Sequence, residues 1–225
     1  MSLDITRIQA ICFDVDGTLS DTDDAWVQRL SSFIHVISPW IKKEKIQEFS
    51  RMFIMAAESP ANAVYRLYDW THLDNVLAKL SDRIAHNRAL HQKKNFWIMP
   101  GVKELIESLH ARFPLAIVSA RDEVSTRHFL EQFQLLDHFQ IVVTAQTCSH
   151  TKPYPDPAIH AAQYMNILPE NCLMVGDTTV DILSGKRAGM QTVGVLCGFG
   201  KEKELRKAGA DYILTTTAEL AQLFQ

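Results

Sequence analysis

The sequence predicts an α/β protein with a parallel, Rossmann-like sheet as its core and a block of α-helices inserted after the first strand. From residue 99 onward, short apolar runs alternate with helical patterns. Such alternation is typical of strands joined by helical crossovers in a parallel sheet that is covered on both faces. Residues 20–98 carry helical patterns and no convincing strand, which indicates a separate helical insertion.

The first predicted strand is the apolar run 10–13, Ala-Ile-Cys-Phe. Continuous apolar runs of this kind are typical of strands that are buried on both faces of a sheet. Further strands are predicted at 115–119, 139–144, 172–175, 191–195 and 212–214. Helices are predicted at 102–109, 123–133, 157–165, 179–188, 202–208 and 218–224. Strands and helices therefore alternate to the end of the chain.

The change of pattern at Met99-Pro100-Gly101 marks the predicted domain boundary. Because the strand at 10–13 must belong to the same sheet as the later strands, residues 1–19 and 99–225 are predicted to form one α/β core domain. Residues 20–98 are predicted to form an α-helical cap domain inserted into that core.

The composition is that of an ordinary globular protein, with 47% hydrophobic and 22% charged residues among 225. A net charge of −3 gives no electrostatic reason to expect nucleic acid or an anionic membrane as a partner. No run approaches the roughly 20 apolar residues that span a bilayer, and the first residues lack an apolar signal-peptide core. The four cysteines are widely spaced, which favours reduced thiols over a disulfide framework or a zinc site. We therefore expect a cytoplasmic protein; the sequence carries no sign of its oligomeric state.

Acidic residues follow two of the predicted strands. Asp14 and Asp16 come after the first strand, and Asp177 and Asp181 come after the strand at 172–175. Carboxylates that converge without a cation repel one another and take up protons. Mg²⁺ prefers oxygen ligands and is often shared with a substrate phosphate. The sequence therefore predicts a magnesium site with Asp14 and Asp177 as ligands and Asp181 in a supporting position.

A hydroxyl and a cation are expected at the same edge of the sheet. Ser119 ends the strand at 115–119, and Lys152 lies in the loop after the strand at 139–144. Ligands of open parallel sheets bind outside the carboxyl ends of the strands. A phosphate held there would need the charge of Lys152, the hydroxyl of Ser119 and backbone N–H groups of the turn after Asp14.

Four motifs of this sequence resemble those of the haloacid dehalogenase (HAD)-like hydrolases in identity, order and spacing. They are Phe13-Asp14-Val15-Asp16-Gly17-Thr18, Ser119, Lys152 and Gly176-Asp177-Thr178-Thr179-Val180-Asp181. The resemblance covers essentially the whole chain, including a helical cap inserted after the first motif, and implies a HAD-like fold. The sequence is most similar in appearance to the small phosphatases of the phosphoglycolate phosphatase type.

The resemblance implies a Mg²⁺-dependent phosphatase that hydrolyses a small-molecule phosphate monoester. Asp14 would attack phosphorus and form an aspartyl-phosphate intermediate. Asp16 would protonate the leaving alcohol and then activate water, while its backbone carbonyl joins Asp14 and Asp177 as a metal ligand. Lys152 would stabilise the charge of the transferring phosphoryl group. The partner would be a small phosphorylated metabolite.

Contacts to phosphate or substrate are expected from the core and from the cap. The core candidates are Val15, Thr18, Ser119, Ala120, Arg121 and Lys152. An alternative for Arg121 is an ion pair with its neighbours Asp122 or Glu123. The cap candidates are Arg29, Arg66, Trp26 and Tyr65, although aromatic residues at helical spacing also fit the interior of the cap.

Other activities of the same family are less consistent with these residues. Dehalogenases do not carry an acid at the position of Asp16. Sugar-phosphate mutases carry a histidine four residues beyond the position of Thr22, where this chain has Trp26. A catalytically silent regulatory protein on the same fold is the third alternative, and it conflicts with the presence of every motif acid.

Overall fold

The computed structural model describes residues 3–21 and 96–225. Met1–Asp23 and Phe96–Gln225 belong to one compact unit, which contains all of the strands predicted for the core. The cap predicted for 20–98 lies almost entirely outside the described residues, so its helical structure stays a prediction.

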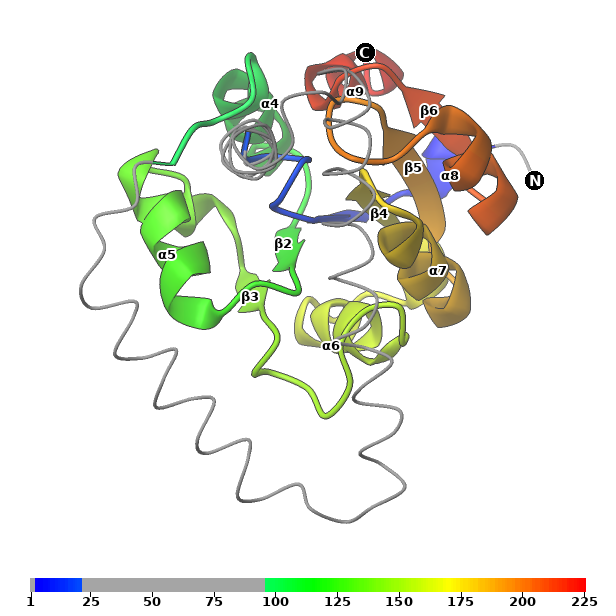
Figure 1. Ribbon diagram of the computed structural model, residues 1–225, viewed down its shortest axis with the longest axis horizontal. Coiled ribbons are helices and arrows are strands. Elements are labelled where there is room, and N and C mark those ends of the chain that lie inside the picture. The colour runs from blue at the N-terminus through cyan, green and yellow to red at the C-terminus, as the bar shows by residue number, and fades with distance from the viewer. Residues whose placement is uncertain (1–2, 22–95) are drawn as a thin grey trace, which may run out of the picture. The chain divides into compact units, whose positions relative to one another are not determined.

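The core is a six-stranded parallel sheet with the strand order β3-β2-β1-β4-β5-β6 (Figure 1). The strands are β1 Ala10–Phe13, β2 Leu115–Val118, β3 Ile141–Val143, β4 Cys172–Gly176, β5 Gln191–Val195 and β6 Tyr212–Leu214. The chain builds the sheet outward from β1 to β3 and then returns to the other side of β1. This reversal creates a topological switch point between β1 and β4, where open α/β sheets bind their ligands.

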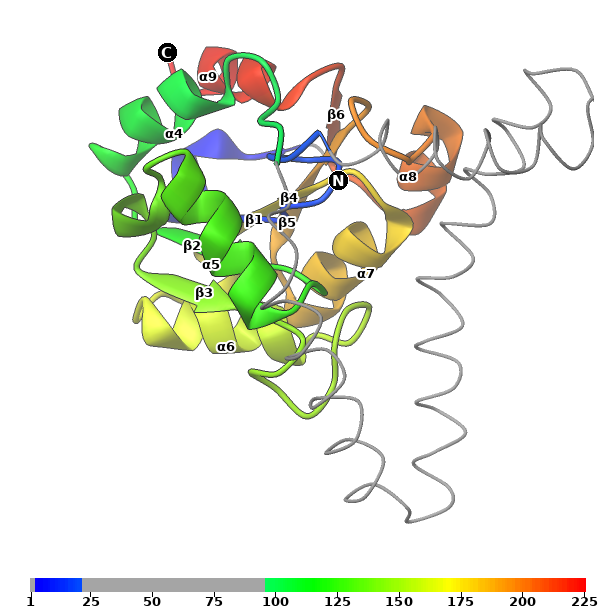
Figure 2. The same cartoon turned by 60° about the vertical axis from the view of Figure 1, so that its left-hand side comes forward.

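Helices cover both faces of the sheet. They are α4 Val102–His110, α5 Glu123–Gln132, α6 Asp156–Tyr164, α7 Thr179–Ala188, α8 Glu202–Ala208 and α9 Leu220–Leu223. Short 3₁₀ helices occur at Ile5–Arg7, Leu136–His138, Pro169–Asn171 and Thr217–Glu219. α4, α5 and α9 lie on one face of the sheet, whereas α6 and α7 lie on the other (Figures 1 and 2). The predicted α/β class is confirmed.

Alternate side chains of the central strands enter two separate cores. In β4, Leu173 and Val175 pack into the core beneath α4, α5 and α9. Cys172 and Met174 point to the opposite core, which α6 lines with alanines. Because both faces are buried, these strands read as unbroken apolar runs in the sequence.

Most predicted elements agree with the structure to within one residue at each end, but two of them start two residues away from the observed element. The strand expected at 139–144 is limited to Ile141–Val143, because the N–H of Thr144 turns away from the sheet to the hydroxyl of Thr147 at 2.9 Å. The helix expected at 218–224 begins as the 3₁₀ helix Thr217–Glu219 and continues as the short α9. Its start is fixed by Thr217, whose buried hydroxyl donates to the Thr18 carbonyl at 2.6 Å.

Truncating the centre of the sheet is expected to destabilise the protein strongly. Leu173 is fully buried in β4, so Leu173→Ala should lower the free energy of unfolding by about 2–5 kcal/mol through lost burial and the cavity left behind. Urea unfolding measures this loss. The same substitution at Leu168, which is 63% exposed, is the control and should change stability by less than about 0.5 kcal/mol. Equal effects at both positions would contradict the packing described above.

Candidate active site

A tight turn follows β1 and carries the first motif. The Val15 carbonyl accepts from the N–H groups of Leu19 at 2.9 Å and of Ser20 at 2.8 Å, which folds residues 15–20 onto themselves. Gly17 adopts a positive φ of 73° within this turn. A Cβ atom there would lie 2.4 Å from a carboxylate oxygen of Asp177. The first motif is therefore packed directly against the acid that follows β4.

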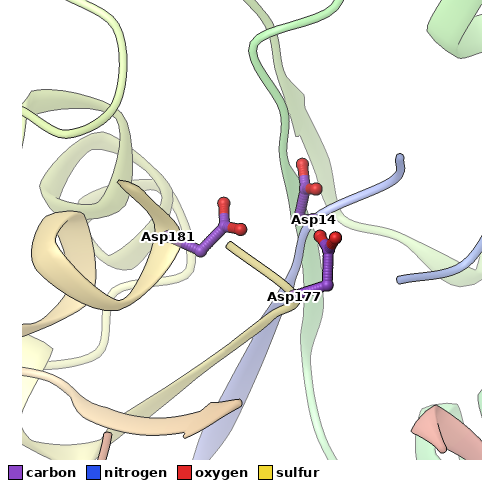
Figure 3. Close-up of side chains that lie close together, drawn as sticks. All are labelled: Asp14, Asp177 and Asp181. Carbon is purple, nitrogen blue, oxygen red and sulfur yellow. The ribbon is translucent and has the colours of Figure 1, made fainter. Parts of the chain in front are cut away.

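Three buried carboxylates meet at the switch point between β1 and β4. Asp14 comes from the end of β1, Asp177 from the end of β4, and Asp181 from the first turn of α7 (Figure 3). Each offers an oxygen atom that lies within 4.8 Å of the others. The register places this cluster, since Phe13 of β1 lies beside Val175 of β4 and the Asp14 N–H donates to the Val175 carbonyl at 2.9 Å.

Lys152 brings a positive charge into this cluster. Its Nζ donates to Asp14 Oδ1 at 2.7 Å and to Asp181 Oδ1 at 2.5 Å, and its side chain is only 3% exposed. Burial opposes the charge on Lys152, but the attraction of Asp14 and Asp181 outweighs it and raises the pKa of this lysine above its usual range.

Acids outnumber cations in the part of the cluster that the structure describes. Three carboxylates face one ammonium group there, which leaves an excess of two negative charges when all are ionised. Burial raises the pKa of Asp14 to about 8, although the nearby charge of Lys152 lowers it. The cluster therefore favours either a bound proton or a further cation. An all-oxygen set of carboxylate ligands is the donor set that Mg²⁺ prefers, so these residues fit a magnesium ion.

Asp181 is held by partners on both of its oxygen atoms. Oδ1 accepts from Lys152, and Oδ2 accepts from the Thr178 N–H at 3.0 Å and from the Thr178 hydroxyl at 2.6 Å. The contacts with Thr178 form a capping box at the start of α7. Asp181 thus links Lys152 to the first turn of α7. This arrangement fits the supporting position predicted for Asp181.

Hydrogen bonds hold both carboxylate oxygens of Asp177. Its Oδ2 accepts from the Phe199 N–H at 2.8 Å, and its Oδ1 accepts from the Thr18 hydroxyl at 3.3 Å. A Cβ on Gly198 would lie 2.1 Å from Asp177 Oδ2, and one on Gly200 would lie 1.9 Å from the Asp177 carbonyl oxygen. The loop 198–200 therefore positions Asp177, a role that the motifs did not indicate. In the sequence, the only indication of this role for the loop was the pair of glycines that flank Phe199 after β5.

Asp16 lies at the edge of the cluster and forms an ion pair with Arg121. Nε of Arg121 donates to Asp16 Oδ2 at 2.9 Å, and Nη2 donates to Asp16 Oδ1. The alternative pairing of Arg121 with its sequence neighbours is wrong. Asp122 instead caps α5 by accepting from the Ser125 N–H at 2.9 Å, and Glu123 pairs along the helix with Arg127.

The remaining candidates are placed as follows. Ser119 is buried after β2, where its N–H donates to the Val143 carbonyl at 2.9 Å and its Oγ accepts from the Arg121 N–H at 3.1 Å. Ala120 beside it is exposed. Val15 is buried in the turn after β1, and the Thr18 hydroxyl donates to Asp177. The four cap candidates, Arg29, Arg66, Trp26 and Tyr65, lie outside the described residues.

The family model of the haloacid dehalogenase-like hydrolases matches residues 11–195. The chain belongs to this family. The matched region begins in β1 and ends with β5, so it contains all four motifs that converge at the switch point. The resemblance stated from these motifs and the HAD-like fold predicted from it are therefore confirmed.

Individual relatives match over nearly their whole length. The pyrophosphatase PpaX of Oceanobacillus iheyensis is 31% identical over 210 residues, which are 92% of this chain and 92% of that protein. A phosphoglycolate phosphatase of Chromobacterium violaceum is 28% identical over 229 residues, covering 99% of both chains. The crystal structure of a hydrolase from Pseudomonas syringae is 25% identical, with a TM-score of 0.68 over 96% of this chain and 98% of that one. The prediction of a phosphatase-type hydrolase is confirmed.

Within residues 3–21 and 96–225, no helix has the length and apolar character that a membrane span requires.

Proposed function

We propose that this protein hydrolyses the phosphate monoester of a small metabolite, with Mg²⁺ bound, through an aspartyl-phosphate on Asp14. One observation carries the proposal: Asp14 lies at the switch point with one oxygen fixed and the other available. Oδ1 accepts from Lys152, whereas Oδ2 accepts no hydrogen bond from the described residues. A carboxylate held in this way is oriented for attack by Oδ2.

In the first step, Oδ2 of Asp14 forms a bond to phosphorus while the bond from phosphorus to the leaving oxygen breaks. Asp16, two residues on, gives a proton to that oxygen, so the leaving group departs as an alcohol. In the second step, Asp16 takes a proton from water as the water oxygen bonds to phosphorus. The bond between phosphorus and Asp14 then breaks, which releases inorganic phosphate and the free carboxylate.

Positive charge and fixed donors stabilise the phosphoryl group in both steps. Lys152 neutralises Asp14 before attack and faces the developing charge on the phosphoryl oxygens. Ser119 offers a hydroxyl at the end of the neighbouring strand. Asp14, Asp177 and the Asp16 carbonyl would hold Mg²⁺, which supplies further positive charge to the phosphate when bound.

The names of the relatives support a small phosphorylated substrate. One matched protein is called a pyrophosphatase and the other a phosphoglycolate phosphatase. Both names describe a phosphoryl group carried by a small molecule. Since each relative matches this chain over at least 92% of its length, the same class of substrate is proposed here.

Hydrolysis of p-nitrophenyl phosphate tests the proposed activity without assuming a natural substrate. We expect turnover with Mg²⁺, loss of turnover after chelation, and its return when Mg²⁺ is added in excess. Asp177→Asn should raise the Mg²⁺ concentration needed for half-maximal rate. The folded protein without turnover at any pH from about 5 to about 9, the range in which carboxyl acid–base catalysts operate, would favour the silent regulatory alternative.

A further inference from the structure

The ion pair between Asp16 and Arg121 engages the carboxylate that is proposed to transfer protons during hydrolysis. Two guanidinium nitrogens engage the two oxygens of Asp16 side by side. The Arg121 side chain is 11% exposed and that of Asp16 is 26% exposed, so the pair is largely shielded from water. Bidentate pairs of this kind are among the stronger charged contacts in proteins.

Both the backbone and the side chain of Arg121 make further contacts at the edge of the site. Its backbone N–H donates to Ser119 Oγ at 3.1 Å, and its carbonyl accepts from the Ala145 N–H at 3.2 Å. Its guanidinium lies over the ring of Phe96, 5.1 Å from the centroid. The chain at Phe96 is fixed in turn, because the Gln132 side-chain amide binds both the N–H and the carbonyl of that residue.

This ion pair competes with the proton transfer that is proposed for Asp16. A leaving-group oxygen must reach one oxygen of Asp16, and both are engaged by Arg121. Separating the pair takes from the shielded guanidinium the carboxylate to which it donates two hydrogen bonds, which is costly for a charge removed from water. The cost falls if the arriving substrate brings an anion of its own to that place.

We propose that Arg121 is a specificity-determining residue that exchanges Asp16 for an anionic group on the leaving part of the substrate. The preferred substrates are then phosphate esters or anhydrides in which a carboxylate or a second phosphate lies a few bonds from the scissile oxygen. The planar edge of a guanidinium binds either group through two parallel hydrogen bonds. The position is suitable because Arg121 is tied to Ser119, which is proposed to hold the transferring phosphate. The proposal rests on the phosphatase activity proposed above.

A matched substrate pair tests the exchange. 2-Phosphoglycolate and 2-hydroxyethyl phosphate differ in whether the leaving group ends in a carboxylate or in a neutral hydroxymethyl group. We expect the wild-type protein to favour the carboxylate ester by about 10- to 100-fold in kcat/KM, the value of one charged hydrogen-bonded contact. Pyrophosphate, compared with the same neutral ester, distinguishes a second phosphate from a carboxylate as the preferred anion.

Substitution of Arg121 should remove the preference and not the chemistry. Arg121→Gln should lower kcat/KM for the anionic substrate, mainly by raising KM, and should change kcat/KM for the neutral ester much less, because that ester brings no anion to Arg121. Arg121→Lys keeps the charge without the planar edge and should retain part of the preference. It also serves as the test if the glutamine variant does not fold. Arg127→Gln removes an exposed arginine of α5 and should change neither substrate.

The possible outcomes distinguish a failure of the role proposed for Arg121 from a failure of the proposed phosphatase activity. Equal wild-type kcat/KM for the two esters, or an equal loss on both in Arg121→Gln, would overturn the exchange and leave the phosphatase activity standing. Absence of turnover on both esters and on p-nitrophenyl phosphate would overturn the proposed function itself.

Discussion

Replacing Asp14 with asparagine is expected to lower the rate of phosphate-ester hydrolysis by on the order of 10⁴-fold or more, as the loss of a covalent nucleophile does in other enzymes. The amide oxygen of asparagine can still accept from Lys152, but neither of its terminal atoms can act as the nucleophile that Oδ2 of Asp14 provides. Folding should be preserved, because the substitution also removes one of three carboxylates that repel one another at this buried position.

Two measurements and one control make this test specific. Circular dichroism and thermal unfolding should show a native fold in Asp14→Asn. Asp122→Asn is the matched control, because Asp122 caps α5 away from the cluster and asparagine caps helices equally well. Its turnover should equal that of the wild type.

The covalent intermediate itself can be trapped. With p-nitrophenyl phosphate, whose weakly basic leaving group departs without a proton from Asp16, Asp16→Asn should still form the aspartyl-phosphate but hydrolyse it slowly, since the residue that activates water is lost. Mass spectrometry after a single turnover should then show one added phosphoryl group, located on Asp14. Retention of turnover in Asp14→Asn, or a phosphoryl group on another residue, would remove Asp14 as the nucleophile.

The sheet and the acidic cluster could be predicted because their signals are local. Strands buried on both faces must be apolar throughout, so β1 and β4 stand out from the polar residues that end them. The acids directly after those ends must meet once the strands are parallel neighbours. Asp14 and Asp177 are therefore brought together by topology alone, and Asp181 follows from the helical turn that begins at Thr178.

Contacts between residues distant in the sequence could not be predicted in this way. The expected partners of Arg121 were its immediate neighbours, but the start of α5 directs Asp122 and Glu123 to the helix itself. That leaves Arg121 to cross to Asp16, which is 105 positions earlier. The loop 198–200 was missed for a similar reason, since its function depends on close packing against a residue 22 positions earlier.

Gly198→Ala is expected to weaken Mg²⁺ binding by about 10- to 100-fold, the usual effect of disturbing a group that orients a metal ligand. The new Cβ would lie 2.1 Å from Asp177 Oδ2 and 2.6 Å from the Gly17 carbonyl oxygen. Neither contact can be tolerated, because Asp177 is fully buried and the Gly17 carbonyl belongs to the turn of the first motif. The carboxylate of Asp177 or the loop must move, and the hydrogen bond from the Phe199 N–H is then lost.

Mg²⁺ affinity should be measured by calorimetry and by the rise of the unfolding temperature with added Mg²⁺, neither of which depends on turnover. Gly189→Ala is the control. Gly189 ends α7 with a positive φ of 86°, and a Cβ atom added to it would meet none of the described atoms within 4 Å. Alanine there costs about 1–2 kcal/mol of backbone strain without touching the cluster. Both variants should lose stability, but only Gly198→Ala should lose Mg²⁺ affinity. An unchanged affinity in folded Gly198→Ala would mean that Asp177 does not need this loop to bind the metal.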